Sequence, residues 1–395
     1  MRTFDTVVIG GGASGIIAAI SAKRKGRSVI ICEKMPQIGK KILASGGGRC
    51  NLLNDKVDTS FYNPAGRGIT GSILKRFGVE AILNFFRDIG LEVYSEDGRI
   101  FPATNQASSV LKVLEIELKR LSVPVELNCE VTGISTDGEG FSVDTKKDKG
   151  LKCRKLIVTG GGKAYPALGS NGACYKFAKQ FRHKIIEPVP SAVSIVAKDE
   201  MCHLLQGQKI SAIARSVIDG KIRSEACGDA IFTKYGLSGT AVLDISEEIS
   251  VALNRYHNKN IFVSIDMVPF LDQGRLRDEI GKRIRKGLPP EEMLAGILPN
   301  KFGRALKNIA EEKDADRIAS ALKDKRFRAI DTRGWNEAEF TAGGVDVSEI
   351  NEATLESKLR KGLYFAGEIL DVNGKRGGYN LAWAWASGFV AGLTE

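Results

Sequence analysis

The sequence contains little that could hold a structural metal. Among its 395 residues only three are histidines, His183, His203 and His257, and neighbouring cysteines are never closer than the eighteen positions that separate Cys32 from Cys50. There is therefore no CxxC pair and no combination of residues at the spacing of a zinc site. Single cysteines that lie far apart in the sequence are typical of proteins from a reducing compartment. We expect no metal and a cytoplasmic protein.

We expect neither a signal peptide nor a membrane-spanning hydrophobic run. A strand is expected to begin by Thr6, which leaves no room for a cleaved leader. The apolar stretch VVIGGGASGIIAAI, residues 7–20, contains four glycines. It is shorter than the roughly 20 residues that a helix needs to span a bilayer. We expect no membrane segment.

Runs of five or six like charges are absent, although the formal net charge is +11. Basic and acidic residues alternate, and aromatic residues do not accompany the basic clusters. This pattern is typical of a solvated surface with some attraction for phosphates, rather than of a nucleic-acid-binding face. We therefore expect a small-molecule substrate and consider nucleic acid an unlikely partner.

What the chain does contain is a change of texture along its length. Residues 5–34 read as strand, glycine turn, helix and strand, and residues 94–106 read as irregular. Beyond residue 190 antiparallel strands are expected, with a hairpin at Asp219-Gly220 and a strand at 241–248. Residues 271–326 carry amphipathic helices, and strands with glycine resume after Arg333. These patterns predict one α/β domain interrupted by an insertion of roughly 150 residues, part β and part helical.

A dinucleotide-binding turn is expected near the start of the chain. Gly10, Gly12 and Gly15 form GxGxxG between a strand and a helix, where they permit a tight turn, approach of a pyrophosphate and close helix packing. Glu33 lies eighteen residues after Gly15, at the end of the next strand, where a carboxylate binds a ribose. An acidic residue there admits FAD or NAD and argues against NADP. The alternative is a glycine turn that binds no ligand.

Further glycine clusters favour FAD over NAD. They are GKKILASGGGRCN (39–51), IVTGGGKAYPALGSNG (157–172) and GLYFAGEILDVNGKRGGYNLAWAWASG (362–388). FAD is long and must be held on several edges, and glycine lets the backbone approach it closely. Arg49 would neutralise a phosphate or lie near the ring. The alternatives are a mobile turn at 46–48, a turn residue at Asp371 and a small buried residue at Cys50.

The expected FAD-binding residues come from these segments and from one strand between them. They are Gly10, Gly12, Ala13, Ser14, Gly15, Glu33, Lys34, Lys40, Lys41, Gly47, Gly48, Arg49, Cys50, Asn51, Val131, Thr159, Gly160, Gly161, Tyr165, Gly367, Glu368, Asp371, Gly378, Tyr379, Asn380 and Leu381. Trp383 and Trp385 are more typical of packing than of stacking on a ring.

Several of these motifs resemble one family. SGGGRCN, GLSG (236–239), TLESK (354–358) and GEILDVNG with GGYN are similar to those of the YhiN/BaiN-like NAD(P)/FAD-dependent oxidoreductases, also called the aminoacetone-oxidase family. The resemblance implies an α/β fold: a glutathione-reductase-like FAD-binding domain with three layers (ββα), interrupted by a β-barrel insert with a helical subdomain. The corresponding ranges are 1–190 and 343–395 for the FAD-binding domain, 191–270 for the barrel, 271–326 for the helical subdomain and 327–342 for the return strand of the insert.

The chain departs from the family pattern at two places. Leu168, Asn171, Ala173 and Cys174 replace a Thr, a Thr, an Asp and a Gly, and Lys234 stands where His is common. Both places are expected to lie at a ring or substrate contact. The substrate therefore does not follow from the resemblance.

The chemistry expected is that of a flavin. A disulfide reductase would need two cysteines at the ring, whereas Cys50 stands alone, and no second complete GxGxxG unit would hold a nicotinamide. We expect an FAD-dependent oxidoreductase that passes hydride through flavin N5 to or from a small organic substrate between the FAD domain and the insert. NAD(P)H would be a transient donor, or oxygen the acceptor. No catalytic acid or base is assigned. The candidates for that role, by location only, are Lys234, Tyr235 and Arg376.

Two other functions stay open. An RNA-modifying flavoprotein could dock RNA on the basic insert, since residues 271–330 hold fifteen Lys/Arg against ten Asp/Glu. Steep salt dependence of RNA retention would distinguish it. A flavin-holding sensor without turnover would be reduced slowly by every donor.

Overall fold

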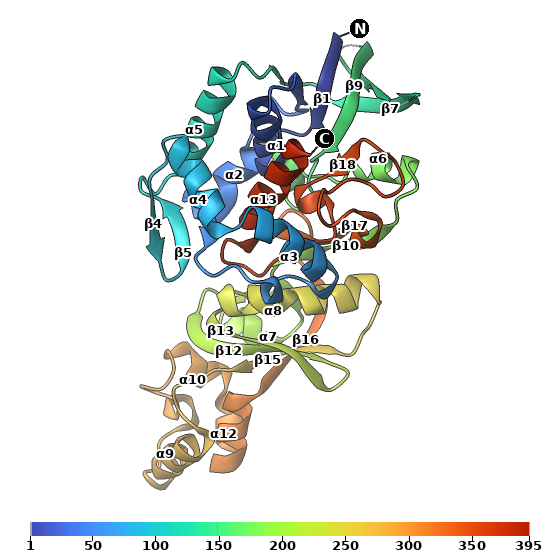
Figure 1. Ribbon diagram of the computed structural model, residues 1–395. Coiled ribbons are helices and arrows are strands. Elements are labelled where there is room, and N and C mark those ends of the chain that lie inside the picture. Colours follow the sequence, from blue (N-terminus) through green and yellow to red (C-terminus); the bar gives the residue numbers. More distant parts are fainter. Residues whose placement is uncertain (1, 139, 148, 395) are drawn as a thin grey trace. The chain divides into compact units, whose positions relative to one another are not determined.

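The computed structural model describes residues 2–138, 140–147 and 149–394, and the chain forms two compact units (Figure 1). Unit 1 comprises Met1–Pro188 and Phe340–Glu395, and unit 2 comprises Val189–Glu339. The chain leaves unit 1 along β10 (Ile185–Ser191) and re-enters it along β17 (Phe340–Val345), and these two strands pair with each other. The expected domain boundaries, including those within the insert, stay a prediction.

A seven-stranded sheet forms the centre of unit 1, in the order β6-β2-β1-β9-β8-β7 with β18 paired to β9. Strands β1, β2, β9 and β18 run parallel, with Val8 opposite Ile31 on one side and Ile157 on the other. These side chains are fully buried, as expected for a parallel sheet covered on both faces. The strands are β1 (Arg2–Ile9), β2 (Val29–Cys32), β6 (Val125–Glu126), β7 (Val131–Asp137), β8 (Gly140–Thr145), β9 (Lys149–Val158) and β18 (Leu363–Phe365).

The first and last long helices of unit 1 pack backbone against backbone. These are α1 (Ala13–Arg24) and α13 (Tyr379–Leu393) (Figure 1). A Cβ atom added to Gly388 would lie 2.3 Å from the carbonyl oxygen of Ser14, and one added to Gly392 would lie 2.4 Å from that of Ala18. The glycines therefore allow this close approach, which brings the two ends of the chain together.

A small sheet in unit 1 corrects one expectation. Residues 94–106, expected to be irregular, include most of the hairpin of β4 (Val93–Glu96) and β5 (Arg99–Pro102), and β3 (Leu53–Asn54) pairs with β5. The hairpin turns at Asp97 and Gly98, which both have positive φ, 50° and 76°. Asp-Gly in such a two-residue turn is a strong hairpin signal, which the sequence interpretation overlooked.

Unit 1 contains five further α-helices among its described residues. They are α2 (Lys40–Ala44), α3 (Arg67–Arg76), α4 (Val79–Asp88), α5 (Ala107–Arg120) and α6 (Tyr175–Gln180).

Unit 2 contains a closed antiparallel barrel in the order β11-β14-β13-β12-β15-β16. The predicted hairpin at Asp219-Gly220 is confirmed, because these residues join β12 to β13 with φ of 51° and 75°. The strands are β11 (Ile195–Ala197), β12 (Lys209–Ile218), β13 (Lys221–Thr233), β14 (Gly236–Ser238), β15 (Ile261–Asp266) and β16 (Lys325–Thr332).

One expected strand of unit 2 is a helix. Residues 241–248 lie within α8 (Thr240–Ser250), so this prediction was wrong. Its buried residues Ala241, Val242, Ile245 and Ile249 recur at helical spacing, which outweighs the β propensity of valine and isoleucine. The other helices of unit 2 are α7 (Glu200–Leu204), α9 (Gln273–Arg285), α10 (Lys301–Ala305), α11 (Lys307–Glu311) and α12 (Ala315–Lys323).

Candidate functional site

The glycines of the first turn differ in what surrounds them. Gly10 has φ of +104°, and a Cβ there would lie 2.7 Å from the carbonyl oxygen of Thr159; a Cβ on Gly15 would lie 1.9 Å from that of Gly10. The hydroxyl of Thr159 donates to the carbonyls of Ile9 and Gly10, both at 2.9 Å. A Cβ on Gly12 would meet nothing within 4 Å. Gly10 and Gly15 thus pack the turn, while Gly12 borders open space where α1 begins.

The carboxylate of Glu33 is fixed beside this turn. It is buried, and it accepts hydrogen bonds from the backbone N–H groups of Gly11 at 2.6 Å and Met35 at 2.8 Å. A carboxylate has about four lone-pair positions, so two acceptor positions are left for a ligand. Ala13 and Ser14 form the first turn of α1, which has no side-chain cap. The turn and the acidic residue therefore lie together, as the sequence predicted.

The second glycine cluster also presents bare backbone. Gly47 and Gly48 have φ of +66° and +88°, and a Cβ on either would meet nothing within 4 Å. Cys50, which follows, is fully buried with φ of 59°, and its burial raises the pKa of the thiol to about 11. A thiol with that pKa is neutral at physiological pH, which fits the interpretation of Cys50 as a small buried residue.

Arg49 has partners that the sequence interpretation did not suggest. Its guanidinium lies 2.8 Å from the carboxylate of Glu96 and 2.8 Å from the hydroxyl of Tyr94, and 4.1 Å above the ring of Phe101. These three residues belong to the β4–β5 hairpin, which was not expected. Contact of Arg49 with a phosphate or a flavin ring stays a prediction.

The loop after Arg49 lies against the loop that precedes α13. The side chain of Asn54 donates to the carbonyl of Gly377 at 3.2 Å, and a Cβ on Gly378 would lie 2.4 Å from the carbonyl carbon of Leu53. In the orientation that satisfies both of its ends, the amide of Asn51 accepts from the N–H of Gly378 at 3.2 Å. Two segments more than 300 residues apart in the chain are therefore neighbours.

The loop before α13 is held by side chains from the first turn of α13 and from residues 61–63. Asn380 accepts from the N–H of Gly374 and donates to the carbonyl of the same residue, both at 2.8 Å. The ring of Tyr379 stacks on that of Phe61, with 4.5 Å between centroids. Asp371 is buried, 3.4 Å from the amide of Asn63. These contacts shape the loop, and direct contact of Asp371, Tyr379 or Asn380 with a cofactor stays a prediction.

Glu368 joins three parts of the site. Its carboxylate lies 2.7 Å from the ammonium of Lys41 on α2, accepts from the N–H of Thr341 at 2.9 Å and lies 3.4 Å from the N–H of Gly162. The preceding Gly367 has φ of +78° and packs on Ser14. The sequence predicted Lys41 and Glu368 but not their ion pair.

Trp383 and Trp385 are packing residues, as expected, and each donates a hydrogen bond to a loop of the site. The indole N–H of Trp383 donates to the carbonyl of Gly367 at 3.2 Å, and that of Trp385 donates to the carbonyl of Leu52 at 3.0 Å. Both rings are buried.

The loop after β9 contains one of the family departures. Asn171 accepts a hydrogen bond from the ammonium of Lys34 at 2.7 Å, two residues beyond the end of β2. This departure therefore lies near Glu33, and its contact with a ring or a substrate stays a prediction. Within the same loop, a Cβ on Gly160 would lie 2.1 Å from the sulfur of Cys174, while Gly161 and Tyr165 have positive φ, 71° and 57°.

Several predicted residues have less informative surroundings. Val131 is buried at the beginning of β7, and Lys40 and Leu381 are half-buried. Lys234 is exposed, and the ring of Tyr235 lies 4.4 Å below the guanidinium of Arg333. Neither arrangement identifies a catalytic group, nor does the half-buried Arg376.

Sequence reasoning missed two residues of the site, Thr341 and Tyr175. Tyr175 is buried, and among the described residues its hydroxyl has no hydrogen-bond partner. Burial raises its pKa, and the charges of Glu368 and Asp371 raise it further. A buried hydroxyl without a partner is rare in folded proteins.

The residues present fit a bound dinucleotide. Bare backbone borders open space at Gly12, Gly47 and Gly48, a fixed carboxylate lies beside the first turn, and the hydroxyl of Tyr175 lacks an acceptor or donor within the described chain. FAD would place its pyrophosphate at the N-terminus of α1 and its ribose at Glu33. Within residues 2–138, 140–147 and 149–394, no group of three His, Cys, Asp or Glu could hold a metal ion. No helix in this part of the chain has the length and hydropathy of a membrane span.

Comparison with known proteins agrees with the fold. Residues 4–394 match the family described as HI0933-like protein Rossmann domain. The chain is 36% identical to a 3-dehydro-bile acid delta(4,6)-reductase of Clostridium scindens, over 98% of this chain and 97% of that protein. It is 30% identical to a ribosomal RNA dihydrouridine synthase of Escherichia coli, over 99% of this chain and 97% of that protein.

Solved flavoprotein structures share the fold. A 3-ketosteroid delta1-dehydrogenase of Sterolibacterium denitrificans matches with a TM-score of 0.55 at 12% identity, over 99% of each chain. A flavocytochrome c3 fumarate reductase matches with a TM-score of 0.51 at 17% identity, over 99% of this chain and 78% of the other. The predicted fold class and the resemblance to the YhiN/BaiN-like oxidoreductases are confirmed. The chain belongs to the HI0933-like family, and it is an FAD-dependent oxidoreductase.

Proposed function

We propose that this protein reduces a carbon–carbon double bond conjugated to a carbonyl group in a small organic substrate. In the net reaction, NAD(P)H gives a hydride that ends on the β-carbon, and a proton from solvent ends on the α-carbon. Bound FAD would supply, through its N5 position, the two-electron relay between NAD(P)H and the substrate.

The observation that carries this proposal is the 36% identity to a bile-acid reductase over 98% of the chain. Similarity of that extent covers both units, so it includes more than the dinucleotide turn. The second relative, named for dihydrouridine synthesis, supports the same bond type. Dihydrouridine differs from uridine by reduction of a double bond conjugated to a carbonyl, although the two substrates are otherwise unlike.

The residues of unit 1 would bind and orient the cofactor. The backbone at Gly12, Gly47 and Gly48 would approach it closely, and Glu33 would accept hydrogen bonds from its ribose. The ion pair of Lys41 and Glu368 fixes α2 relative to the loop before α13. No acid or base is assigned, so the proton is drawn from solvent in this proposal.

The test is spectroscopic. Purified protein should be yellow, and NADH or NADPH should bleach it without oxygen. A 3-oxo-4-ene steroid or its bile-acid analogue should then restore the colour and gain two hydrogen atoms, which mass spectrometry would detect. Bleaching by a saturated amine or alcohol alone, with reoxidation by oxygen, would instead identify an oxidase. Colourless protein that FAD does not reconstitute would overturn both.

A second candidate substrate is RNA. The relatives of Escherichia coli and Haemophilus influenzae, 30% and 29% identical, are both named ribosomal RNA dihydrouridine synthases. The basic excess of residues 271–330 supports it less strongly, because ion pairs occupy several of these side chains. Arg283 pairs with Glu279 at 3.0 Å and Arg317 with Glu312 at 2.7 Å. RNA retention that falls steeply with salt would favour this candidate, and its absence in a filter-binding assay would remove it.

A further inference from the structure

Thr341 lies at a junction between two loops of the site. It is the second residue of β17 and is buried. Its hydroxyl oxygen accepts hydrogen bonds from the backbone N–H groups of Lys163 at 2.8 Å and Ala164 at 3.1 Å. Its own backbone N–H donates to the carboxylate of Glu368 at 2.9 Å. One residue thus holds the loop after β9 and the acidic residue before α13.

Two backbone N–H groups of the loop after β9 have this hydroxyl as their acceptor. Residues 160–164 have left the ladder of β9, so their N–H groups need other acceptors. Ala164 is fully buried, and a Cβ on Gly162 would lie 2.3 Å from the hydroxyl oxygen of Thr341. The loop therefore packs directly on Thr341, with a glycine at the point of contact and two donors directed at one oxygen.

Glu368 extends the same arrangement to a third segment. Besides the N–H of Thr341, its carboxylate contacts the ammonium of Lys41 at 2.7 Å. Valine would fill nearly the same volume as Thr341 but would offer no acceptor to the two N–H groups. Packing alone therefore does not require a threonine here.

We propose that Thr341 is a positioning residue for FAD, which holds residues 160–164 and Glu368 in the single arrangement that receives the cofactor. This inference rests on the FAD-dependent function stated above. The hydroxyl of Thr341 acts through the N–H groups of Lys163 and Ala164, which follow Gly160 and Gly161 in the same loop. Its contact with Glu368 is made by the backbone N–H, which a substitution of the side chain keeps. Nothing in the sequence near Thr341 indicates this, since Lys163 lies 178 positions away.

The experiment measures FAD binding to apoprotein by quenching of flavin fluorescence, together with the visible circular dichroism of the bound flavin. Thr341→Val should weaken FAD binding about tenfold and change the dichroism, because two buried donors lose their acceptor. Thr341→Ser keeps the oxygen and should bind within about twofold of the unchanged protein. Thr70→Val is the matched control, since Thr70 is a buried threonine of α3 whose hydroxyl, among the described residues, bonds to the carbonyl of Arg67 alone.

The outcomes separate this inference from the function on which it rests. If Thr341→Val binds FAD as the unchanged protein does, with the same dichroism, the positioning inference is overturned. If Thr341→Val does not fold, Thr341→Ala compared with Thr341→Ser decides, since these differ by one hydroxyl. Equal affinity in that pair overturns the inference, and weaker binding by the alanine variant supports it. If the unchanged protein binds no FAD, the FAD-dependent function fails first.

Discussion

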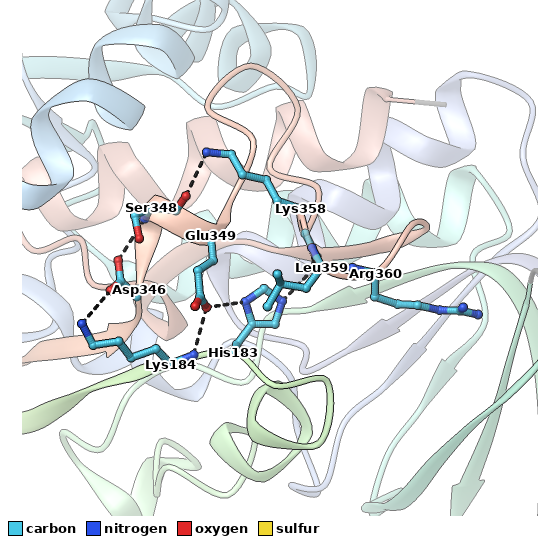
Figure 2. Close-up of polar contacts among 9 residues, drawn as sticks. His183, Lys184, Asp346, Ser348, Glu349, Lys358, Leu359 and Arg360 are labelled. Atoms are coloured by element: carbon cyan, nitrogen blue, oxygen red, sulfur yellow. Dashed lines mark hydrogen bonds and ion pairs between the residues drawn. The ribbon is translucent and has the colours of Figure 1, made fainter.

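The hydroxyl oxygen of Ser357 lies 2.7 Å from Nε2 of His183. Nδ1 of the same ring lies 3.1 Å from the carboxylate of Glu349, as Figure 2 shows. The oxygen of Ser357 also accepts from the N–H groups of Leu359 at 3.0 Å and Arg360 at 2.9 Å. Because both lone pairs are used, the hydroxyl proton must point to Nε2. His183 is therefore neutral, with its own proton on Nδ1 directed at Glu349.

This chain of hydrogen bonds resembles a Ser-His-Glu triad but does not make a nucleophile. Ser357 and His183 are buried, and the oxygen of Ser357 is capped by two backbone donors. The arrangement instead connects the segment after α6 with the loop before β18. The charged groups around it are Lys184, Asp346, Glu349, Lys358 and Arg360 (Figure 2).

Acidification should destabilise the protein through His183. Burial lowers the pKa of His183, and its hydrogen bond to Glu349 opposes this only in part. Below about pH 6.5 the unfolded chain binds a proton at this histidine while the folded chain does not, so the free energy of unfolding falls with falling pH. We expect this fall between about pH 6.5 and the lower pKa of the folded state. Urea unfolding at several pH values would measure it.

Two variants identify the group that titrates. His183→Gln should remove the pH dependence in this window, whereas His257→Gln, at an exposed histidine, should keep it. Asp346 contributes at lower pH, because hydrogen bonds from Ser348 and Lys184 outweigh burial and lower its pKa. Unchanged pH dependence in His183→Gln would contradict the assignment.

Lys155 predicts a second pH dependence, on the alkaline side. It is buried on β9, and burial, with repulsion from Arg27, lowers its pKa to about 7. Between about pH 7 and 10.4 the unfolded chain binds more protons at this lysine, so the free energy of unfolding should rise with pH. The shift in the pKa of Lys155 sets an upper bound of about 5 kcal/mol on this rise. Bonds from the ammonium to Thr394 and its position 4.2 Å above the ring of Tyr364 should reduce the effect.

Replacement of this lysine tests the argument directly. At pH 7 the free energy of unfolding of Lys155→Met, measured with urea, should exceed that of the unchanged protein by about 1 kcal/mol or more. The variant should also lose the rise of this free energy toward pH 10. Lys361→Met, at an exposed lysine before β18, should keep that rise. A rise that persists in Lys155→Met would assign it to another group.

Local patterns explain which parts of the site the sequence could predict. Gly10, Gly12, Gly15 and Glu33 lie within one strand–helix–strand unit, so their arrangement follows from spacing alone. The hairpin at Asp219-Gly220 was predicted for the same reason. The equally local signal at Asp97-Gly98 was overlooked, and with it the partners of Arg49.

Contacts between distant segments could not be predicted. The ion pair of Lys41 with Glu368 joins residues 327 positions apart, and no spacing rule relates them. The strand predicted at 241–248 was wrong because the β propensity of valine and isoleucine decided the prediction, whereas the helical spacing of the apolar residues indicates the helix. Direct contact of the remaining site residues with FAD stays a prediction, since it depends on the position of the cofactor.

The contact between α1 and α13 predicts a large effect from one methyl group. A Cβ on Gly388 would lie 2.3 Å from the carbonyl oxygen of Ser14, which is backbone and cannot move aside alone. Gly388→Ala should therefore lower the free energy of unfolding by about 3 kcal/mol. Gly281→Ala is the control within a helix, since the nearest atom is the flexible end of Arg285 at 3.4 Å. That variant should be neutral or more stable by up to about 1 kcal/mol.

Cys174 and Gly160 should behave as a coupled pair. The family usually has glycine where this chain has Cys174, and a Cβ on Gly160 would lie 2.1 Å from the sulfur and 2.7 Å from the Cβ of that cysteine. Gly160→Ala should therefore lower stability and FAD affinity, and Cys174→Gly should restore much of both in the double variant. The coupling free energy should be at least about 1 kcal/mol, because the two residues are in contact.

A double-variant cycle measured by urea unfolding separates this pair from a general sensitivity of the loop. Cys174→Gly alone removes the sulfur and should cost about 1–2 kcal/mol, since the thiol is largely buried and its pKa is raised to about 11. If the costs of the two single changes simply add, the cysteine can move away from an alanine, and the tight contact does not restrict this position. If Cys174→Gly instead removes most of the cost of Gly160→Ala in the double variant, the side chain of Cys174 is what excludes alanine at position 160. The departure from the family pattern is then a local exchange of volume in the loop expected to contact the cofactor.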